Sequence, residues 1–275
     1  MPIRPADHGI VSASGAGAGT EFSGGSHSTA GGYNYQTYTA TGTVTCVVGG
    51  IVDLILVGGG GGRNQTYLGV WGEQWQGGGG SGGVIYATGV TVAAGTSSLT
   101  IGAGNTGDGD GGNSSIDFAG WNLFTGGGGR GGMGFYNCQN GWAGLTSTPS
   151  VPYVTAGGAG GGPGEYPGLC GGYAGAGSAT STSGTGSGGG TWSTLTSGNG
   201  GASGWLVGGG GGATANGVNK VGGAGHTWVD GVLYGQGGNS SGDSTAPQGG
   251  YGSGAGSDNA SLDGGNGIFI VRWPE

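Results

Sequence analysis

Val52-Asp53-Leu54-Ile55-Leu56-Val57-Gly58-Gly59-Gly60-Gly61-Gly62 is the stretch that decides the fold, because an apolar run passes directly into five glycines. Glycine loses more backbone freedom on ordering than any other residue, and ordering an average residue already costs about 1–2 kcal/mol. Uninterrupted glycine runs recur along the chain, and glycine supplies 84 of the 275 residues. A chain that orders such runs needs a backbone arrangement that only glycine permits.

Three interpretations of the glycine content compete. Collagen requires glycine at every third position and abundant proline, whereas the runs here are contiguous and the chain holds 8 prolines. A disordered chain is poor in hydrophobic and aromatic residues, whereas 33% of this chain is hydrophobic and 8 Trp, 11 Tyr and 5 Phe are present. Disorder stays open as an alternative, with more weight for residues 174–204 than for the whole chain.

The third and favoured interpretation is a packed lattice of glycine runs. A glycine run can adopt the polyproline-II shape, which is left-handed with three residues per turn, a rise of about 3.1 Å and no internal hydrogen bonds. Because glycine keeps its N–H and has no Cβ, such runs can approach closely and bond to one another, which satisfies backbone groups that burial would orphan. The predicted scaffold glycines are Gly58, Gly59, Gly60, Gly61, Gly62, Gly77, Gly78, Gly79, Gly80, Gly126, Gly127, Gly128, Gly129, Gly208, Gly209, Gly210, Gly211 and Gly212.

Strand signals lie between the glycine runs. Residues 33–39 alternate aromatic or Thr side chains with polar ones, the period of a half-buried strand, and no window shows a convincing helical period. Further strands are predicted at residues 43–48, 51–57, 84–87, 90–92, 98–101 and 268–273, and residues 116–124 are interpreted as a loop. The predicted fold class is all-β: an antiparallel β-sandwich or sheet base with inserted layers of polyglycine-II helices.

The pattern divides the chain at residue 33. Residues 1–32 are poorly patterned, as in a frayed terminus or a tail that docks on something larger, and we interpret them as an N-terminal docking segment. Residues 33–275 are predicted to form one glycine-rich β domain, a length that suits a single domain.

Charge and cysteine content exclude several classes of function. The chain carries 5 Lys plus Arg against 13 Asp plus Glu, a formal net charge of −8, so it lacks the basic footprint that a nucleic-acid partner requires. Cys46, Cys138 and Cys170 form no disulfide framework and are expected to be buried free thiols. No stretch approaches the 18 apolar residues of a membrane span, so membrane insertion is not expected.

No combination of side chains predicts catalysis. His8, His27 and His226 are far apart in the sequence and lack a Ser/Asp or Cys partner pattern, so no catalytic role can be assigned. Residues 102–107 match G-x-G-x-x-G, but a nucleotide site also needs a helix to open there, and the Asp/Gly sequence that follows is a poor helix start. We therefore expect no enzyme activity and no cofactor.

One loop offers three oxygen-bearing side chains, Asp108, Asp110 and Asn113. Calcium favours such clusters, but Asp and Gly in this density are also typical of a simple turn. The turn is the preferred interpretation, so no metal is predicted, and whether Asp108 and Asp110 bind calcium stays open.

Aromatic residues concentrate in the segments between glycine runs. Tyr and Trp dominate binding hot spots because they give a large contact area at low entropy cost. The competing interpretation, slightly favoured for any single residue, is that they cover the edges of a lattice that has no side chains of its own. The candidate receptor-binding residues are Trp71, Trp75, Trp121, Phe124, Phe135, Tyr136, Trp142, Tyr153, Tyr166, Trp192, Trp228 and Tyr234.

Five segments combine strand and glycine signals: residues 38–43, 52–62, 77–85, 98–104 and 264–273. Through them, residues 33–275 resemble the glycine-rich domain found in bacteriophage tail proteins, and the layered runs are similar to those in the tail-fibre adhesins of T-even-like phages. The resemblance implies packed polyglycine-II helices that support variable loops, and loops that touch a bacterial receptor.

The expected function is that of a phage virion structural protein, a tail-fibre or adhesin subunit that mediates attachment to the host surface. Its expected partners are other virion proteins, through the N-terminal segment, and a host cell-surface glycan or outer-membrane protein. A homo-oligomer, for example a trimer, is expected. The alternatives are a purely structural virion component (capsid decoration or head fibre), an extracellular filament subunit, and an ice-binding protein.

Overall fold

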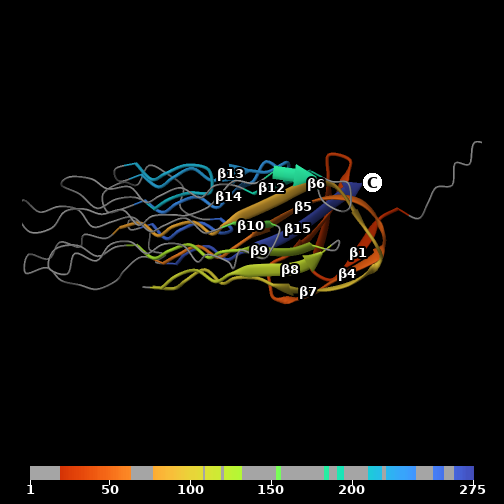
Figure 1. Ribbon diagram of the computed structural model, residues 1–275, viewed down its shortest axis with the longest axis horizontal. Helices are drawn as coiled ribbons and strands as arrows, with labels where there is room; N and C mark the ends of the chain where they lie inside the picture. The colour runs from red at the N-terminus through yellow and green to blue at the C-terminus, as the bar shows by residue number, and fades with distance from the viewer. Residues whose placement is uncertain are drawn as a thin grey trace, which may run out of the picture.

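Two β-sheets and a set of glycine runs build the molecule (Figure 1). The computed structural model describes residues 19–62, 77–107, 109–118, 121–131, 153–155, 183–185, 191–194, 210–218, 221–239, 250–256 and 263–275. Every regular element among these residues is a β-strand, so the predicted all-β class is confirmed.

The six-stranded sheet has the order β1-β4-β7-β8-β9-β10. Its strands are β1 (Glu21–Ser23), β4 (Gly42–Val48), β7 (Gly95–Thr100), β8 (Ser114–Phe118), β9 (Trp121–Thr125) and β10 (Tyr153–Thr155). Neighbours are antiparallel except β9 and β10, which pair in parallel. The predicted antiparallel base is thus confirmed with one parallel pair at its edge.

The seven-stranded sheet has the order β11-β12-β6-β5-β15-β3-β2 and is antiparallel throughout. Its strands are β11 (Ser183–Thr185), β12 (Thr191–Thr194), β6 (Val84–Val92), β5 (Gly50–Val57), β15 (Ile268–Pro274), β3 (Tyr33–Tyr38) and β2 (Ser26–Ala30). A small hairpin of β13 (His226–Thr227) and β14 (Leu233–Tyr234) completes the described elements.

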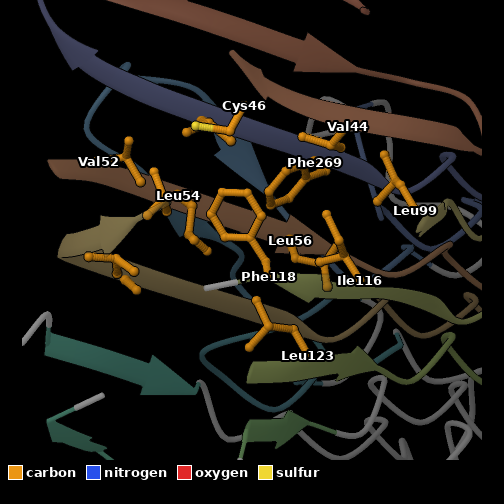
Figure 2. Packing of buried hydrophobic residues seen from close by; sticks show 14 of the residues in the cluster. Val44, Cys46, Val52, Leu54, Leu56, Leu99, Ile116, Phe118, Leu123 and Phe269 are labelled. Atoms are coloured by element: carbon orange, nitrogen blue, oxygen red, sulfur yellow. The ribbon is translucent and has the colours of Figure 1, made fainter. Parts of the chain in front are cut away.

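The core lies between the two sheets, and β5 explains why the chain needs a continuous apolar run. Leu54 and Leu56 pack in a cluster with residues of both sheets, among them Phe269 (Figure 2). Successive strand residues point to opposite faces, so Ile55 and Val57 face away from this core into a second cluster. Because both faces of β5 are buried, four consecutive apolar side chains are required.

The second cluster covers the outer face of the seven-stranded sheet. Ala213, Trp228 and Tyr234 pack there against Ile55 and Val57. Trp228 and Tyr234 retain 4% and 2% of their accessible surface. The segment around the β13–β14 hairpin therefore acts as a third layer on the sandwich.

Strand β6 corrects the prediction of two separate strands at residues 84–87 and 90–92. The structure forms one strand, and its register with β5 shifts opposite Asp53. Gly89 takes a φ of 66° at the irregularity, a conformation that glycine adopts without steric cost. Its N–H donates to Asp53 Oδ1 at 2.9 Å. The break between the two predicted strands is thus a β-bulge within one strand.

Asp53 also links β5 to β15. Arg272 Nη2 lies 2.8 Å from Asp53 Oδ2, and the guanidinium stacks 4.2 Å over the Tyr33 ring. Burial lowers the pKa of Arg272, but the hydrogen bonds and the charge interactions with Tyr35 and Asp53 together raise it above its ordinary value. One carboxylate therefore holds both the bulge and the neighbouring strand.

Replacing Asp53 by Asn is expected to lower the free energy of unfolding by about 1–2 kcal/mol, because a charge-assisted hydrogen bond becomes a neutral one. The Asn carbonyl still accepts from Gly89, so the bulge is kept. Urea unfolding followed by tryptophan fluorescence measures the change. Asp117→Asn, on an exposed position of β8, is the matched control and should leave stability unchanged; an equal loss in both variants would contradict the assignment.

Two other differences concern weakly patterned segments. Residues 116–124, predicted to be a loop, belong to the β8–β9 hairpin, in which Ile116 pairs with Leu123. Strands β1 and β2 lie before residue 33 and pair with β4 and β3. The sheets thus begin ahead of the sequence-based boundary, because backbone pairing with a neighbouring strand does not require an apolar pattern. A docking role for residues 1–32 stays a prediction.

The ionisation of Tyr38 is expected to lower the stability of the sandwich at high pH. Its hydroxyl donates to Ser23 O at 2.9 Å, and burial, followed by the proximity of Cys46, raises the pKa of Tyr38 from 10.0 to about 12. In the unfolded chain the Tyr38 hydroxyl ionises near pH 10, whereas in the folded state it stays neutral to a higher pH. The contribution of Tyr38 to the free energy of unfolding is therefore complete below pH 10 and is lost as the pH rises toward 12. The loss should reach about 2–3 kcal/mol. Tyr38→Phe should show a shallower decline in unfolding experiments across this range, and identical profiles would contradict the prediction.

Candidate functional site

The glycine runs leave the two sheets at a common end, as Figure 1 shows. In the seven-stranded sheet, the last residue of β5, Val57, lies opposite Val84 and Ile268, the first residues of β6 and β15. In the six-stranded sheet, Ser114 at the start of β8 lies opposite Thr125 at the end of β9. The runs that follow or precede these residues therefore form one bundle beyond the sheets.

Ser114 connects the two sheets where the bundle begins. Its hydroxyl donates to Val57 O at 2.7 Å and accepts from Gly102 N–H at 2.9 Å. The side chain is fully buried. A single hydroxyl therefore joins the end of β5, the start of β8 and the segment after β7.

The run 58–62 donates backbone hydrogen bonds with a period of three residues. The donors and acceptors are Gly58 N–H to Gly83 O (3.0 Å), Gly59 to Gly112 (2.9 Å), Gly60 to Gly265 (2.8 Å), Gly61 to Gly80 (2.9 Å) and Gly62 to Gly109 (2.9 Å). Positions 58 and 61 thus bond to the segment 77–83, and positions 59 and 62 to the segment 109–112. Position 60 bonds to a third segment, 263–267.

The carbonyl groups of the same run reach three further segments. Gly59 and Gly62 accept from Gly128 and Gly131, Gly60 accepts from Asn105, and Gly61 accepts from Ala255, at 2.8–3.1 Å. The acceptor pattern again repeats after three residues. The run 58–62 is therefore surrounded by six segments, each joined to it through main-chain bonds.

The close approach of these segments leaves no room for side chains. A Cβ built on any glycine of the run 58–62 collides with a carbonyl oxygen of a neighbouring segment: Gly126, Ala103, Ser253, Gly129 and Gly107 for positions 58 to 62 in order. The scaffold glycines at 58–62, 77–80, 126–129 and 210–212 are all buried. Gly208 and Gly209 lie outside the described residues.

Asn and Asp side chains supply acceptors within the bundle. Asn105 Oδ1 accepts from Gly109 N–H, Asn113 from Gly127, Asn239 from Gly222, Asn266 from Gly104, and Asp110 from Arg130, at 2.7–3.0 Å. This role was not predicted, although the sequence carries a signal for it, since each of the five residues has a glycine as a direct neighbour. Of the side chains that had suggested calcium, Asp110 and Asn113 each accept a backbone N–H through Oδ1, and Asp108 lies outside the described residues.

The predicted receptor-binding residues fall into three groups. Six lie outside the described residues: Trp71, Trp75, Phe135, Tyr136, Trp142 and Tyr166. Four lie on strands, with Trp121 and Phe124 in β9, Tyr153 in β10 and Trp192 in β12; of these, the Phe124 side chain is half-buried.

Trp228 and Tyr234 correct the prediction. Both are buried in the cluster on the outer face of the seven-stranded sheet, and Tyr234 Oη donates to Asp230 Oδ2 at 2.7 Å. They are core residues of the sandwich rather than contact residues, and they cover the seven-stranded sheet. Among the candidates whose side chains the structure describes, Phe124 lies in the six-stranded sheet, whereas Trp228 and Tyr234 lie on the outer face of the seven-stranded sheet.

Reactive side chains are dispersed over the described part of the chain. Cys46 is a buried free thiol, as predicted, and burial raises its pKa; Cys138 and Cys170 lie outside the described residues. His226 stacks on Tyr86 with ring centres 4.5 Å apart, and burial lowers its pKa. Among the described residues no three His, Cys, Asp or Glu side chains cluster as metal ligands, and none of these residues forms a helix long and apolar enough to cross a bilayer.

Comparison with known proteins adds no relative: no family model matches the chain, and no curated protein matches it.

Proposed function

We propose that the glycine runs are polyglycine-II helices stacked in layers on the end of the β-sandwich. The support is the period of three in both donors and acceptors of the run 58–62, because a polyproline-II-type helix has three residues per turn and directs its groups outward. The segment 77–83 repeats the pattern: Gly79 and Gly82 donate to one segment, and Gly80 and Gly83 to another.

We further propose that the protein is a virion component, a phage tail-fibre or adhesin subunit that attaches to a host surface. The observation that carries this proposal is the run 58–62 held by six neighbours. Such a bundle projects from the sandwich as a stiff support without presenting side chains of its own. A support of this kind suits the display of the chain segments that connect its runs.

The connecting segments supply the candidate contacts. The segment 63–76 joins two described glycine runs and contains Trp71 and Trp75. Binding there would be non-covalent, through aromatic, Asn, Ser and Thr side chains, to a cell-surface glycan or an outer-membrane protein. Other virion proteins would bind the opposite, sheet end of the molecule, where β1 and β2 lie, through the N-terminal segment 1–32.

Replacing Trp71 and Trp75 by Ala is expected to weaken binding to isolated host envelopes about thirtyfold or more, since a hot-spot residue contributes about 2 kcal/mol. Co-sedimentation with the envelopes measures the affinity, and thermal unfolding checks that the fold is kept. Val229→Ala, an exposed position on the β13–β14 hairpin, is the control. If the wild-type protein binds none of the host envelopes tested, the proposal is contradicted.

A purely structural subunit is the second candidate, favoured by exposed apolar side chains. Val218, Val229, Val232 and Leu233 are 64%, 48%, 43% and 39% exposed, and such residues could pack against neighbouring subunits. Antibody labelling of intact particles in the electron microscope separates the two candidates. Label at tail tips supports attachment, whereas label over the head or along a filament supports the structural role.

A further inference from the structure

A cavity opens between the edge strands of the two sheets, on the β1 and β2 side of the sandwich. Its volume is about 450 Å³, and it is lined by Gly19, Thr20, Glu21, Phe22, His27, Asn34, Gln36 and Trp273. Strands β1 and β2 are edge strands of the six- and seven-stranded sheets. The cavity is therefore the place where the space between the sheets reaches the surface.

Polar residues occupy inward-facing positions beside this cavity. Residues directly opposite on neighbouring strands share a face; Asn34 lies opposite Trp273, and Gln36 lies opposite Val271 and His27. Trp273 and Val271 belong to the core between the sheets, so His27, Asn34 and Gln36 face the same way. Inward positions of a sandwich normally carry apolar side chains, and a buried polar residue is the more informative observation.

Gln36 is the strongest sign of a binding function. The residue is 4% exposed, and its Nε2 donates to Gly24 O. Its Oε1 is buried and has no hydrogen-bond partner among the described residues. A buried acceptor left unpaired costs about 1–3 kcal/mol, and the broad terminal torsion of Gln allows the oxygen to turn toward a donor.

The lining favours a cation. The exposed residue Glu21 carries a carboxylate, and Gln36 carries a carbonyl oxygen without a partner in the described part of the chain. Asn34 Oδ1 lies 3.2 Å from His27 Nε2 and has a second lone pair for a further donor, and none of the eight lining residues is Lys or Arg. Phe22 and Trp273 supply the aromatic part of the lining, and their exposed fractions are 6% and 4%. A guanidinium presents five donors and no acceptor, and the chain's net charge of −8 attracts it.

We propose that this cavity binds the guanidinium group of an arginine side chain from a partner protein, with Gln36, Asn34 and Glu21 as acceptors. The proposal does not depend on the function proposed above, since it concerns the sheet end of the molecule and its own residues.

Titration of the full chain with N-acetyl-arginine amide tests the proposal, with the neutral isostere N-acetyl-citrulline amide as the matched ligand. We expect saturable NMR shifts of the Gln36 side-chain amide and the Trp273 indole, and binding of the citrulline compound about tenfold weaker, since hydrogen bonds to charged groups are roughly twice as strong. Equal binding of both compounds overturns cation recognition.

Variants locate the site. Glu21→Gln, at an exposed residue, should weaken binding of the arginine compound about threefold, the size of an exposed ion pair, whereas Asp117→Asn should not change it. Gln36→Leu should abolish binding while the protein still melts cooperatively. Unchanged binding in both Glu21→Gln and Gln36→Leu overturns the assignment.

Arg4 of the chain itself, outside the described residues, is a competing occupant. Binding of the arginine compound to Arg4→Gln protein but not to the wild type would overturn the assignment to a partner protein, because Arg4 would then fill the site. Absence of binding to both proteins would overturn the proposal.

Discussion

Replacing Gly60 by Ala will lower the free energy of unfolding by about 4 kcal/mol or more, because overpacking costs about 1–3 kcal/mol and each buried backbone group left unpaired adds about 1–3. The new methyl group collides with the Ser253 carbonyl oxygen, a backbone atom that cannot rotate away. Separation of the segments would break the bonds from Gly60 N–H to Gly265 O and from Asn105 N–H to Gly60 O. A domain stable by about 5–15 kcal/mol could lose its fold from this one methyl group.

Gly42→Ala is the matched control for this experiment. Gly42 lies at the start of β4, is exposed, and has open space around a built Cβ. Ala there reduces the freedom of the unfolded chain and should be neutral or stabilise by up to about 1 kcal/mol. Urea and thermal unfolding of both variants measure the difference; equal stability of the two would show that the run 58–62 is not packed as described.

Replacing Ser114 by Ala is expected to cost about 3 kcal/mol, because the substitution orphans the Gly102 N–H and removes a donor from Val57 O in a buried site. The expected readout is a lower urea midpoint with an unchanged dependence on urea concentration. Hydrogen exchange should also speed up at the Gly102 amide, since its acceptor is lost.

Ser115→Ala is the control, since Ser115 is half-buried and points to the opposite side of β8. It should change stability by less than about 0.5 kcal/mol. An equal effect of both substitutions would indicate a general sensitivity of β8 rather than a specific role of the Ser114 hydroxyl.

Sequence patterns predicted the strands whose side chains carry the signal and missed those that depend on backbone pairing. The apolar run ending at Val57 and the segment 268–273 were predicted correctly, because burial on both faces requires apolar residues at every position. The bulge at Gly89 was missed because a glycine within a strand pattern is also typical of a turn. Strand β2, Ser26–Ala30, is exposed throughout and carries no apolar alternation.

The arrangement of the glycine runs could be predicted only in outline. The absence of side chains indicated close packing, but it also removes the features that would specify which run lies beside which. Gly59 and Gly61 each have a glycine on both sides in the sequence, yet their N–H groups bond to different segments. The acceptor roles of Asn105 and Asn266 likewise depend on contacts across the chain, and they become visible only once the runs are placed.

The six-neighbour packing of the run 58–62 has a mechanical consequence. A pull along the run 58–62 is opposed by shear of main-chain hydrogen bonds in several planes at once, because successive residues bond to different segments. A β-sandwich can separate along the single plane between its sheets, whereas the run 58–62 is hydrogen-bonded on all sides and has no single plane along which it can separate. Load applied at one tip would spread across the cross-section before it reached the strands.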